Sequence, residues 1–269
     1  MAEALIISTH NPRIKRLLLL QQKSSERRRE GLFVVEGLRE LQHCIAAGFR
    51  IDTLFVCPPL LGENAASLPA LPERKFEVAP SLYERIAYRG STEGVMAIVE
   101  ARILTLSDLR LRENPLLIVL EGVEKPGNLG AVLRSADAAS ADAVIVCDPL
   151  TDLYNPNLIR ASLGAIFTVP CVACSSEACI DFLKSRGIQI LTAQLQDSSL
   201  YYDTDMQRAT AIVMGTESTG LSSQWRKAAD AHIRIPMLGE VDSLNVSVSA
   251  AILLFEAVRQ RMRMLAVVP

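Results

Sequence analysis

Three short segments of the chain combine small residues with polar side chains of the kinds that bind or activate a substrate. EKPGNLGAVLRSAD carries Asn128 and Arg134, GTESTGLS carries Glu217, and MLGEVDSLNVSVS carries Ser243 and Asn245. Glycines let backbone amides approach a ligand, and the polar side chains can position it by hydrogen bonds. Taken singly, each segment also has a structural explanation, since Asn128 suits a helix N-cap and Glu217 a solvated loop. A functional interpretation therefore requires the fold to bring the three segments together.

Each segment directly follows a predicted buried strand, in LLIVLEGV, AIVMG and HIRIP respectively. From residue 116 onward, apolar strands alternate with predicted helices in NLGAVLRSADAAS, PNLIRASLGA, ACIDFLKSRG and residues 222–229, and AVIVCD, FTVPCVA and IQILTAQ are the other predicted strands. Such continuous apolar strands separated by helices predict a parallel sheet that is covered on both faces. Because ligands bind such sheets outside the carboxyl ends of the strands, we expect the three segments to converge on one pocket.

The last predicted helix has an unusually polar start. It is apolar from Val246 onward, yet it opens with Ser243, Asn245, Ser247 and Ser249. An unpaired polar group in an apolar setting costs about 1–3 kcal/mol. We therefore expect Ser243 and Asn245 to face the pocket while the rest of the helix packs into the core.

The first hundred residues predict a separate, smaller α/β domain. LFVVEG, TLFVC and GVMAIVE are predicted strands, residues 38–48 are a predicted helix, and PPLLGENAASLPALPE is a predicted loop. The charged segment ARILTLSDLRLREN, which leads to Pro115, is the predicted linker. The expected domains are residues 1–105 and 106–269.

The composition is that of an ordinary folded protein, with 49% hydrophobic and 22% charged residues. No apolar run reaches the roughly 18 residues of a membrane span, and the start lacks the pattern of a secretory signal, so a cytoplasmic protein is expected. In such a protein the six cysteines stay reduced. The CxxC pair in PCVACSSEAC has no matching Cys or His pair, and a buried strand explains it better, so no metal site is expected.

Basic residues cluster near the N-terminus although the formal net charge of the chain is only -2. Two interpretations are equally open from the pattern itself: a solvated helical face, or a surface that contacts phosphates. The cluster consists of Arg13, Lys15, Arg16, Lys23, Arg27, Arg28 and Arg29.

Common cofactor and hydrolase motifs are absent. The sequence contains neither GxGxxG nor GxxxxGK[ST], which disfavours a standard dinucleotide site and a P-loop. GxSxG is also missing and no histidine lies near the three segments, which disfavours Ser-His-Asp hydrolysis. A compact nucleoside-like cofactor that is held largely by backbone groups fits the segments best.

The segments NLGAVLRSAD, VMGTESTGLS and IPMLGEVDSLNVSVSAAI together resemble the three signature motifs of the SpoU/TrmH family of RNA 2'-O-ribose methyltransferases, in the SPOUT superfamily. NPNLIRASLGAIF also resembles a stretch of that family, and FVVEGLREL and STEGVMAIV resemble landmarks of its small N-terminal domain. The resemblance implies a parallel-sheet methyltransferase domain with a trefoil knot, S-adenosylmethionine as cofactor, an RNA substrate and a homodimer.

The resemblance also implies roles for single residues. Arg134 would activate the ribose 2'-hydroxyl, with a substrate phosphate as a possible proton acceptor because a guanidinium normally stays charged. Asn128 and Glu217 would orient Arg134 and the ribose, while Ser243 and Asn245 would position cofactor and substrate. Main-chain contacts to the cofactor are expected at Gly215, Ile235 and Leu244, with Leu195 or its neighbours a further candidate. Ser218 departs from the family pattern, in which a glycine often follows the glutamate, and it affects the expected backbone of that loop.

An RNA substrate makes the basic cluster a candidate for phosphate contacts, joined by Arg160 near the active site. Ribosomal RNA is the favoured substrate, because a separate N-terminal domain occurs in rRNA-modifying members of the family. A tRNA methyltransferase, a base methyltransferase and a non-catalytic RNA-binding relative are the alternatives. The presence of Asn128, Arg134 and Glu217 disfavours a non-catalytic protein, and Asn128 with Arg134 favours ribose over base methylation.

Overall fold

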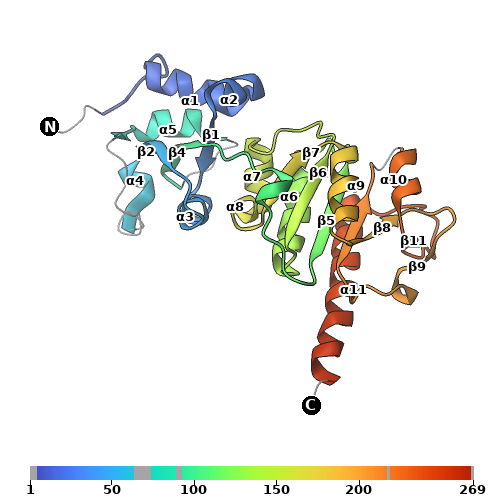
Figure 1. Ribbon diagram of the computed structural model, residues 1–269. Helices are drawn as coiled ribbons and strands as arrows, with labels where there is room; N and C mark the ends of the chain where they lie inside the picture. Colours follow the sequence, from blue (N-terminus) through green and yellow to red (C-terminus); the bar gives the residue numbers. More distant parts are fainter. Residues whose placement is uncertain (1–4, 64–73, 89–92, 217–218, 268–269) are drawn as a thin grey trace. The chain divides into compact units, whose positions relative to one another are not determined.

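The computed structural model describes residues 5–63, 74–88, 93–216 and 219–267, and it divides the chain into two compact units (Figure 1). Unit 1 comprises residues 1–102 together with 152–168, and unit 2 comprises residues 103–151 and 169–269. The return of residues 152–168 to unit 1 was not predicted from the sequence. No helix in the described ranges is long and apolar enough to span a bilayer.

Unit 1 is built on a four-stranded sheet in the order β1-β4-β2-β3. β1 and β2 both pair antiparallel with β4, whereas β3 pairs parallel with β2. Helix α1 begins with Pro12 behind the N-cap Asn11, and it buries Ile14, Leu17 and Leu20 against the sheet, at the spacing of one helical face. The strands are β1 (Leu32–Glu36), β2 (Ile51–Val56), β3 (Lys75–Glu77) and β4 (Val95–Glu100), and the helices are α1 (Pro12–Gln22), α2 (Ser24–Glu30), α3 (Leu38–Ala46), α4 (Pro58–Leu61) and α5 (Pro80–Ile86).

The returning segment adds α7 (Pro156–Ser162) and α8 (Ala165–Thr168) to unit 1. The ring of Tyr154 stacks on Phe33 with centroids 4.2 Å apart, and Phe167 lies 5.3 Å from Phe49. The predicted strand FTVPCVA is therefore wrong in its first half. Its first residues form α8 because Phe167 packs in unit 1, and the strand begins only at Cys171.

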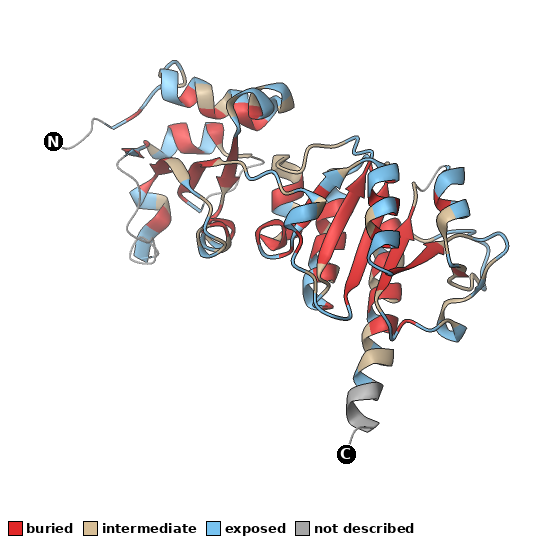
Figure 2. Ribbon diagram, viewed as in Figure 1, coloured by how far each residue is buried: buried red, intermediate tan, exposed pale blue. Residues whose placement is uncertain are grey.

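Unit 2 contains a seven-stranded sheet in the order β7-β6-β5-β10-β8-β11-β9, in which every recorded pairing is parallel. The α/β fold with a parallel sheet is confirmed. The central strands β5, β6, β8 and β10 are buried along most of their length, as Figure 2 shows, whereas β9 and most of β11 are only partly buried or exposed. The strands of this sheet are β5 (Leu116–Glu121), β6 (Ala143–Cys147), β7 (Cys171–Cys174), β8 (Gln189–Ala193), β9 (Ser199–Leu200), β10 (Thr210–Met214) and β11 (Ala231–Arg234).

Helices cover both faces of this sheet. On one face, Leu117 and Val119 of β5 pack in a cluster with Leu183 of α9 (Ser176–Ser185) and Trp225 of α10 (Ser223–Ala228). The intervening residues of β5 are also fully buried, and strand alternation directs them to the opposite face. Helices α6 (Pro126–Ala138) and α11 (Val246–Val267) pack against each other and against the sheet there.

A buried carboxylate ties together the starts of β5 and β6. Both oxygens of Asp142 accept hydrogen bonds from the Arg112 side chain, at 2.9 and 2.8 Å, and the backbone N–H of Leu116 donates at 2.8 Å. The Asp142 side chain is only 3% exposed. Burial would by itself raise the pKa of Asp142, but the hydrogen bonds from Arg112 and Leu116 and the positive charge of Arg112 outweigh it and lower this pKa.

Candidate active site

A cavity of about 440 Å³ opens at the carboxyl ends of β8, β10 and β11 in unit 2. This volume lies within the range of about 300–1,000 Å³ that is typical of small-molecule sites. Residues that follow the three strands form much of its wall, and the segment before α11 completes it. The lining includes Gln194, Leu195, Met214, Gly215, Thr216, Arg226, Arg234, Ile235, Ser243, Leu244, Val246 and Ser249.

All four residues predicted to contact a cofactor through the main chain lie on this cavity: Gly215, Ile235, Leu244 and Leu195. Ser243, predicted to position cofactor and substrate, also lines it. The second and third segments identified in the sequence therefore meet at one place. The role of each residue at that place stays a prediction.

The loop after β10 requires a glycine at its first position. A Cβ atom on Gly215 would collide with the backbone carbonyl group of Gly220. The loop folds back on itself, because the N–H of Gly220 donates to the carbonyl oxygen of Thr216 at 3.0 Å. Because Gly215 has no side chain, its backbone groups face the cavity directly. Glu217 and Ser218 lie outside the described residues.

The first and third segments are joined by a direct contact between two asparagines. Nδ2 of Asn245 donates to Oδ1 of Asn128 at 3.2 Å. Oδ1 of Asn245 accepts from the backbone N–H and the hydroxyl of Ser247, at 2.9 and 2.6 Å, so Asn245 caps the start of α11. The polar start of this helix is thus accounted for by a cap and by two serines, Ser243 and Ser249, on the cavity wall.

Arg134 occupies a different position from the predicted cofactor residues. It is exposed on α6 and is not among the described residues that line the cavity. Arg134 lies on the same helix as Asn128, six residues further along. The structure does not place its side chain on the cavity wall.

Gln194 is one of the neighbours of Leu195 that were offered as further candidates, but the sequence did not name it individually. It follows β8 and lines the cavity, and its Nε2 donates to the carbonyl oxygen of Gln196 at 2.9 Å. Its Oε1 is shielded from solvent and has no hydrogen-bond partner among the described residues. Such an orphaned acceptor costs about 1–3 kcal/mol, a cost that a donor group of a bound ligand would remove. Arg226 and Arg234 also line the cavity and bring positive charge to it.

Most of the predicted RNA-binding residues are accessible in unit 1. Lys15, Lys23 and Arg28 are exposed, as is Arg160 at the end of α7. Arg13 is exposed too, with its guanidinium carbon 4.1 Å from the centroid of the Phe76 ring. These five cations are free of recorded ion pairs within the described part of the chain.

Two further arginines of the cluster, the half-buried Arg16 and the exposed Arg29, are paired with acidic side chains. Arg16 forms ion pairs with Glu30 at 2.7 Å and with Asp52 at 3.4 Å. Arg29 pairs with Glu26 and, at 3.1 Å, with Glu30. Their charge is partly neutralised, so they contribute less to an attractive surface than the unpaired cations do.

Arg27 does not belong to this surface. Its side chain is 5% exposed, and its guanidinium pairs with Asp152 at 2.6 Å and donates to the carbonyl oxygens of Leu20 and Gln21. The pair joins α2 to the segment that returns to unit 1. The assignment of Arg27 as a phosphate contact is corrected accordingly, because its hydrogen-bonding groups are used inside the unit.

A parallel sheet with a ligand cavity at its carboxyl edge defines an α/β protein that binds a small molecule there. This chain belongs to the SpoU rRNA methylase family, whose model matches residues 115–255. Residues 11–97 match the MRM3-like substrate binding domain. The family assignment made from the sequence is confirmed.

Known relatives extend over nearly the whole chain. The 23S rRNA (uridine(2479)-2'-O)-methyltransferase of Streptomyces viridochromogenes is 30% identical, over 95% of this chain and 92% of its own length. A crystal structure of an RNA 2'-O ribose methyltransferase is 38% identical, covers 96% of this chain and 100% of its own, and has a TM-score of 0.85. The AdoMet-bound rRNA methyltransferase of Sinorhizobium meliloti is 31% identical, covers 95% and 97% of the two chains, and has a TM-score of 0.86.

Proposed function

We propose that this protein transfers a methyl group from S-adenosylmethionine to a ribose 2'-hydroxyl of ribosomal RNA, within the 23S class on which its relatives act. Family membership supports the reaction and the cofactor. The observation that carries the assignment to this chain is the cavity at the strand ends, which all four predicted cofactor residues line. A tRNA substrate is the alternative, and the two RNA classes are separated by fractionation of labelled RNA.

The cavity suits S-adenosylmethionine in size and in chemistry. Its volume fits a compact nucleoside-like molecule, and the unpartnered Oε1 of Gln194 offers an acceptor for an amino group. Gly215 allows close backbone approach, so main-chain groups can hold much of the cofactor. When bound, the cofactor supplies the methyl group as an activated sulfonium.

The residues of the chain have to activate a weak nucleophile, the ribose 2'-hydroxyl, and align it with the methyl group. Arg134 is the proposed activating residue: its guanidinium stays charged and polarises the hydroxyl, while a substrate phosphate accepts the proton. The contact between Asn245 and Asn128 supports a role for both in orienting the ribose beside the cofactor cavity. Glu217 keeps its proposed role of orienting Arg134, and Ser243 that of positioning the cofactor.

The exposed cations of unit 1 are proposed to bind the phosphates of the RNA. Lys15, Lys23, Arg28, Arg13 and Arg160 are accessible, and the match of residues 11–97 to a substrate binding domain supports an RNA surface there. Each phosphate contact releases counterions, so the affinity for RNA should fall steeply with salt. An affinity that does not change with salt would contradict this surface.

Three further properties are proposed, the knot and the homodimer from family membership and the cytoplasmic location from the sequence pattern. We infer that the methyltransferase domain, proposed as residues 106–269, carries a trefoil knot, that the protein acts as a homodimer, and that it works in the cytoplasm. The proposed substrate-binding domain is residues 1–105. In the structure, residues 152–168 belong to the same compact unit as residues 1–102.

The test is transfer of a labelled methyl group from S-adenosylmethionine to total bacterial RNA that is afterwards fractionated into rRNA and tRNA. Wild type should place alkali-resistant label in rRNA, and Arg134→Ala should lose it. Arg110→Ala, at another exposed arginine of unit 2, is the matched control and should keep it. Label in tRNA would establish the alternative substrate. Absence of label from every fraction, with cofactor binding confirmed by calorimetry, would favour a non-catalytic RNA-binding protein.

A further inference from the structure

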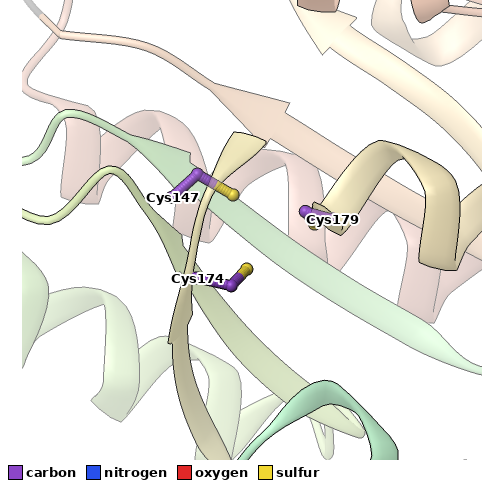
Figure 3. A group of neighbouring side chains, drawn as sticks. All are labelled: Cys147, Cys174 and Cys179. Atoms are coloured by element: carbon purple, nitrogen blue, oxygen red, sulfur yellow. The ribbon is translucent and has the colours of Figure 1, made fainter. Parts of the chain in front are cut away.

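Three cysteines from β6, β7 and α9 meet beneath helix α9 in unit 2. Their sulfur atoms all lie within 4.8 Å of one another, and Figure 3 shows Cys147, Cys174 and Cys179 pointing toward a common space. Cys147 and Cys179 are fully buried, whereas Cys174 is partly exposed. None of the three lines the cavity proposed for the cofactor.

The position of the cluster follows from the sheet register. Cys147 ends β6 and Cys174 ends β7, and the two are direct partners across these neighbouring parallel strands. Partners in register point to the same face of a sheet. That face is covered by α9, which brings Cys179 over the pair one turn into the helix. Only Cys174 of the CxxC pair belongs to the cluster, and the fold joins it to Cys179 and to Cys147 of the neighbouring strand.

We propose that this cluster is a binding site for a thiophilic divalent cation such as Zn²⁺, held by the sulfur atoms of Cys147, Cys174 and Cys179. Thiolate sulfur is the protein ligand that such ions prefer. Zn–S bonds of about 2.3 Å in tetrahedral geometry place sulfur atoms about 3.8 Å apart. Because the separations in the structure do not exceed 4.8 Å, small side-chain rotations are enough to close the site.

Charge and access are compatible with such an ion. On binding, each of the three thiols loses its S–H proton to solvent and forms one sulfur–metal bond. Three thiolates and a divalent cation leave one net negative charge, which the N-terminus of the ten-residue α9 favours. The partly exposed Cys174 gives an entry path, and a fourth coordination position remains for water.

Binding would stabilise the edge of the sheet. β7 is an edge strand of four residues that pairs only with β6 among the described strands. A bound ion would link β6, β7 and α9 through one centre. The expected consequence is a melting temperature that rises with the metal concentration, because the ion binds the folded chain and not the unfolded one.

The test uses the full chain, reduced and freed of metal with a chelator, and titrated without oxygen with Cd²⁺ and with Zn²⁺. A count of six reactive thiols after unfolding verifies the reduced state at the start. One Cd²⁺ per chain should produce thiolate-to-metal absorption in the ultraviolet, and Zn²⁺ should raise the melting temperature. Neither result depends on methyl transfer, so failure here leaves the proposed function untouched.

Matched variants locate the site. Cys174→Ser, at the partly exposed position, should weaken binding by more than the roughly 10- to 100-fold that loss of an outer-sphere partner costs. Cys147→Ala should do the same, with folding checked by circular dichroism. Cys171→Ala is the control, because Cys171 lies on the same strand but alternation directs it to the opposite face. An unchanged spectrum and melting temperature in the wild type would overturn the proposal, as would equal binding by Cys174→Ser and Cys171→Ala.

Discussion

Asn245 has two separable roles, and two substitutions distinguish them. Its Oδ1 caps α11 by accepting the N–H of Ser247, and its Nδ2 donates to Asn128. Asn245→Ala removes both interactions. Asn245→Asp keeps the capping acceptor and places a negative charge at the start of a helix, where it is favourable, but it removes the donor to Asn128.

The expected size of the stability effect follows from the cap. Loss of an N-cap side chain costs about 0.5–2 kcal/mol, typically about 1 kcal/mol. In a domain of about 150 to 250 residues, 1 kcal/mol corresponds to a change of roughly 2–4 °C in the melting temperature. Asn245→Ala should therefore melt roughly 2–4 °C below wild type per kcal/mol lost, whereas Asn245→Asp should melt at or above the wild-type temperature.

Thermal unfolding followed by circular dichroism measures the first role, and methyl transfer to rRNA measures the second. Both variants should lose most of the methyl transfer, because both lose the donor that meets Asn128. An Asn245→Ala variant that melts with wild type would refute the capping argument. An Asn245→Asp variant with full methyl transfer would show that the contact with Asn128 is unnecessary for the reaction.

Three other predictions concern charges and packing. Because the pKa of Asp142 is lowered in the folded state, its carboxylate stabilises the fold fully above about pH 4. In urea unfolding, wild type should have a higher free energy of unfolding than Asp142→Asn at neutral pH, and this difference should disappear as the pH falls through the lowered pKa. Arg27→Ala should lower the free energy of unfolding by about 3 kcal/mol, because it leaves the partly buried carboxylate of Asp152 without its ion pair. Arg28→Ala should leave the free energy of unfolding in urea unchanged and weaken RNA binding in a filter assay at low salt. Trp225→Ala should lower the free energy of unfolding by about 3–5 kcal/mol, and Trp225→Phe, which keeps an aromatic ring but loses the indole N–H and its hydrogen bond to Ser176, should cost less, as measured by urea unfolding. If the two proteins compared in any one of these tests had the same free energy of unfolding at neutral pH, the contact assigned to that residue would be contradicted.

Periodicity was sufficient to predict the longer strands of the sheet in unit 2, but not the two-residue strand β9. The continuous apolar runs at 116–121 and 210–214 are buried strands, and the helix predicted from Asn245 onward begins at Val246. Phe167 and Thr168 were misassigned to a strand because a short apolar run fits a strand or a buried helix equally well. Contact with the aromatic rings of unit 1 decides between them, and no local pattern encodes that contact.

Some residues of the candidate site could be predicted from the sequence and others could not. Gly215, Ile235 and Leu244 could be placed at the cavity because the motifs of a known family carry them in order. Gln194 shows no signal beyond a polar residue at the end of a strand, and only the buried, unpartnered Oε1 identifies it. Cys147 was missed for another reason, since its nearness to Cys174 depends on strand pairing and not on sequence spacing.

The chain crosses between its two units three times, since it leaves unit 1 after Arg102, returns at Asp152 and leaves again after Thr168. Multidomain chains usually fold N-terminal part first during synthesis. Here unit 1 cannot be completed until residue 168 has emerged from the ribosome, because Arg27 and Phe33 find their partners only in the returning segment. β5 and β6 of the second unit have been synthesised by then. Folding of the two units therefore overlaps during synthesis. A single cut of the chain cannot yield either unit complete, because unit 1 is made of two separate segments.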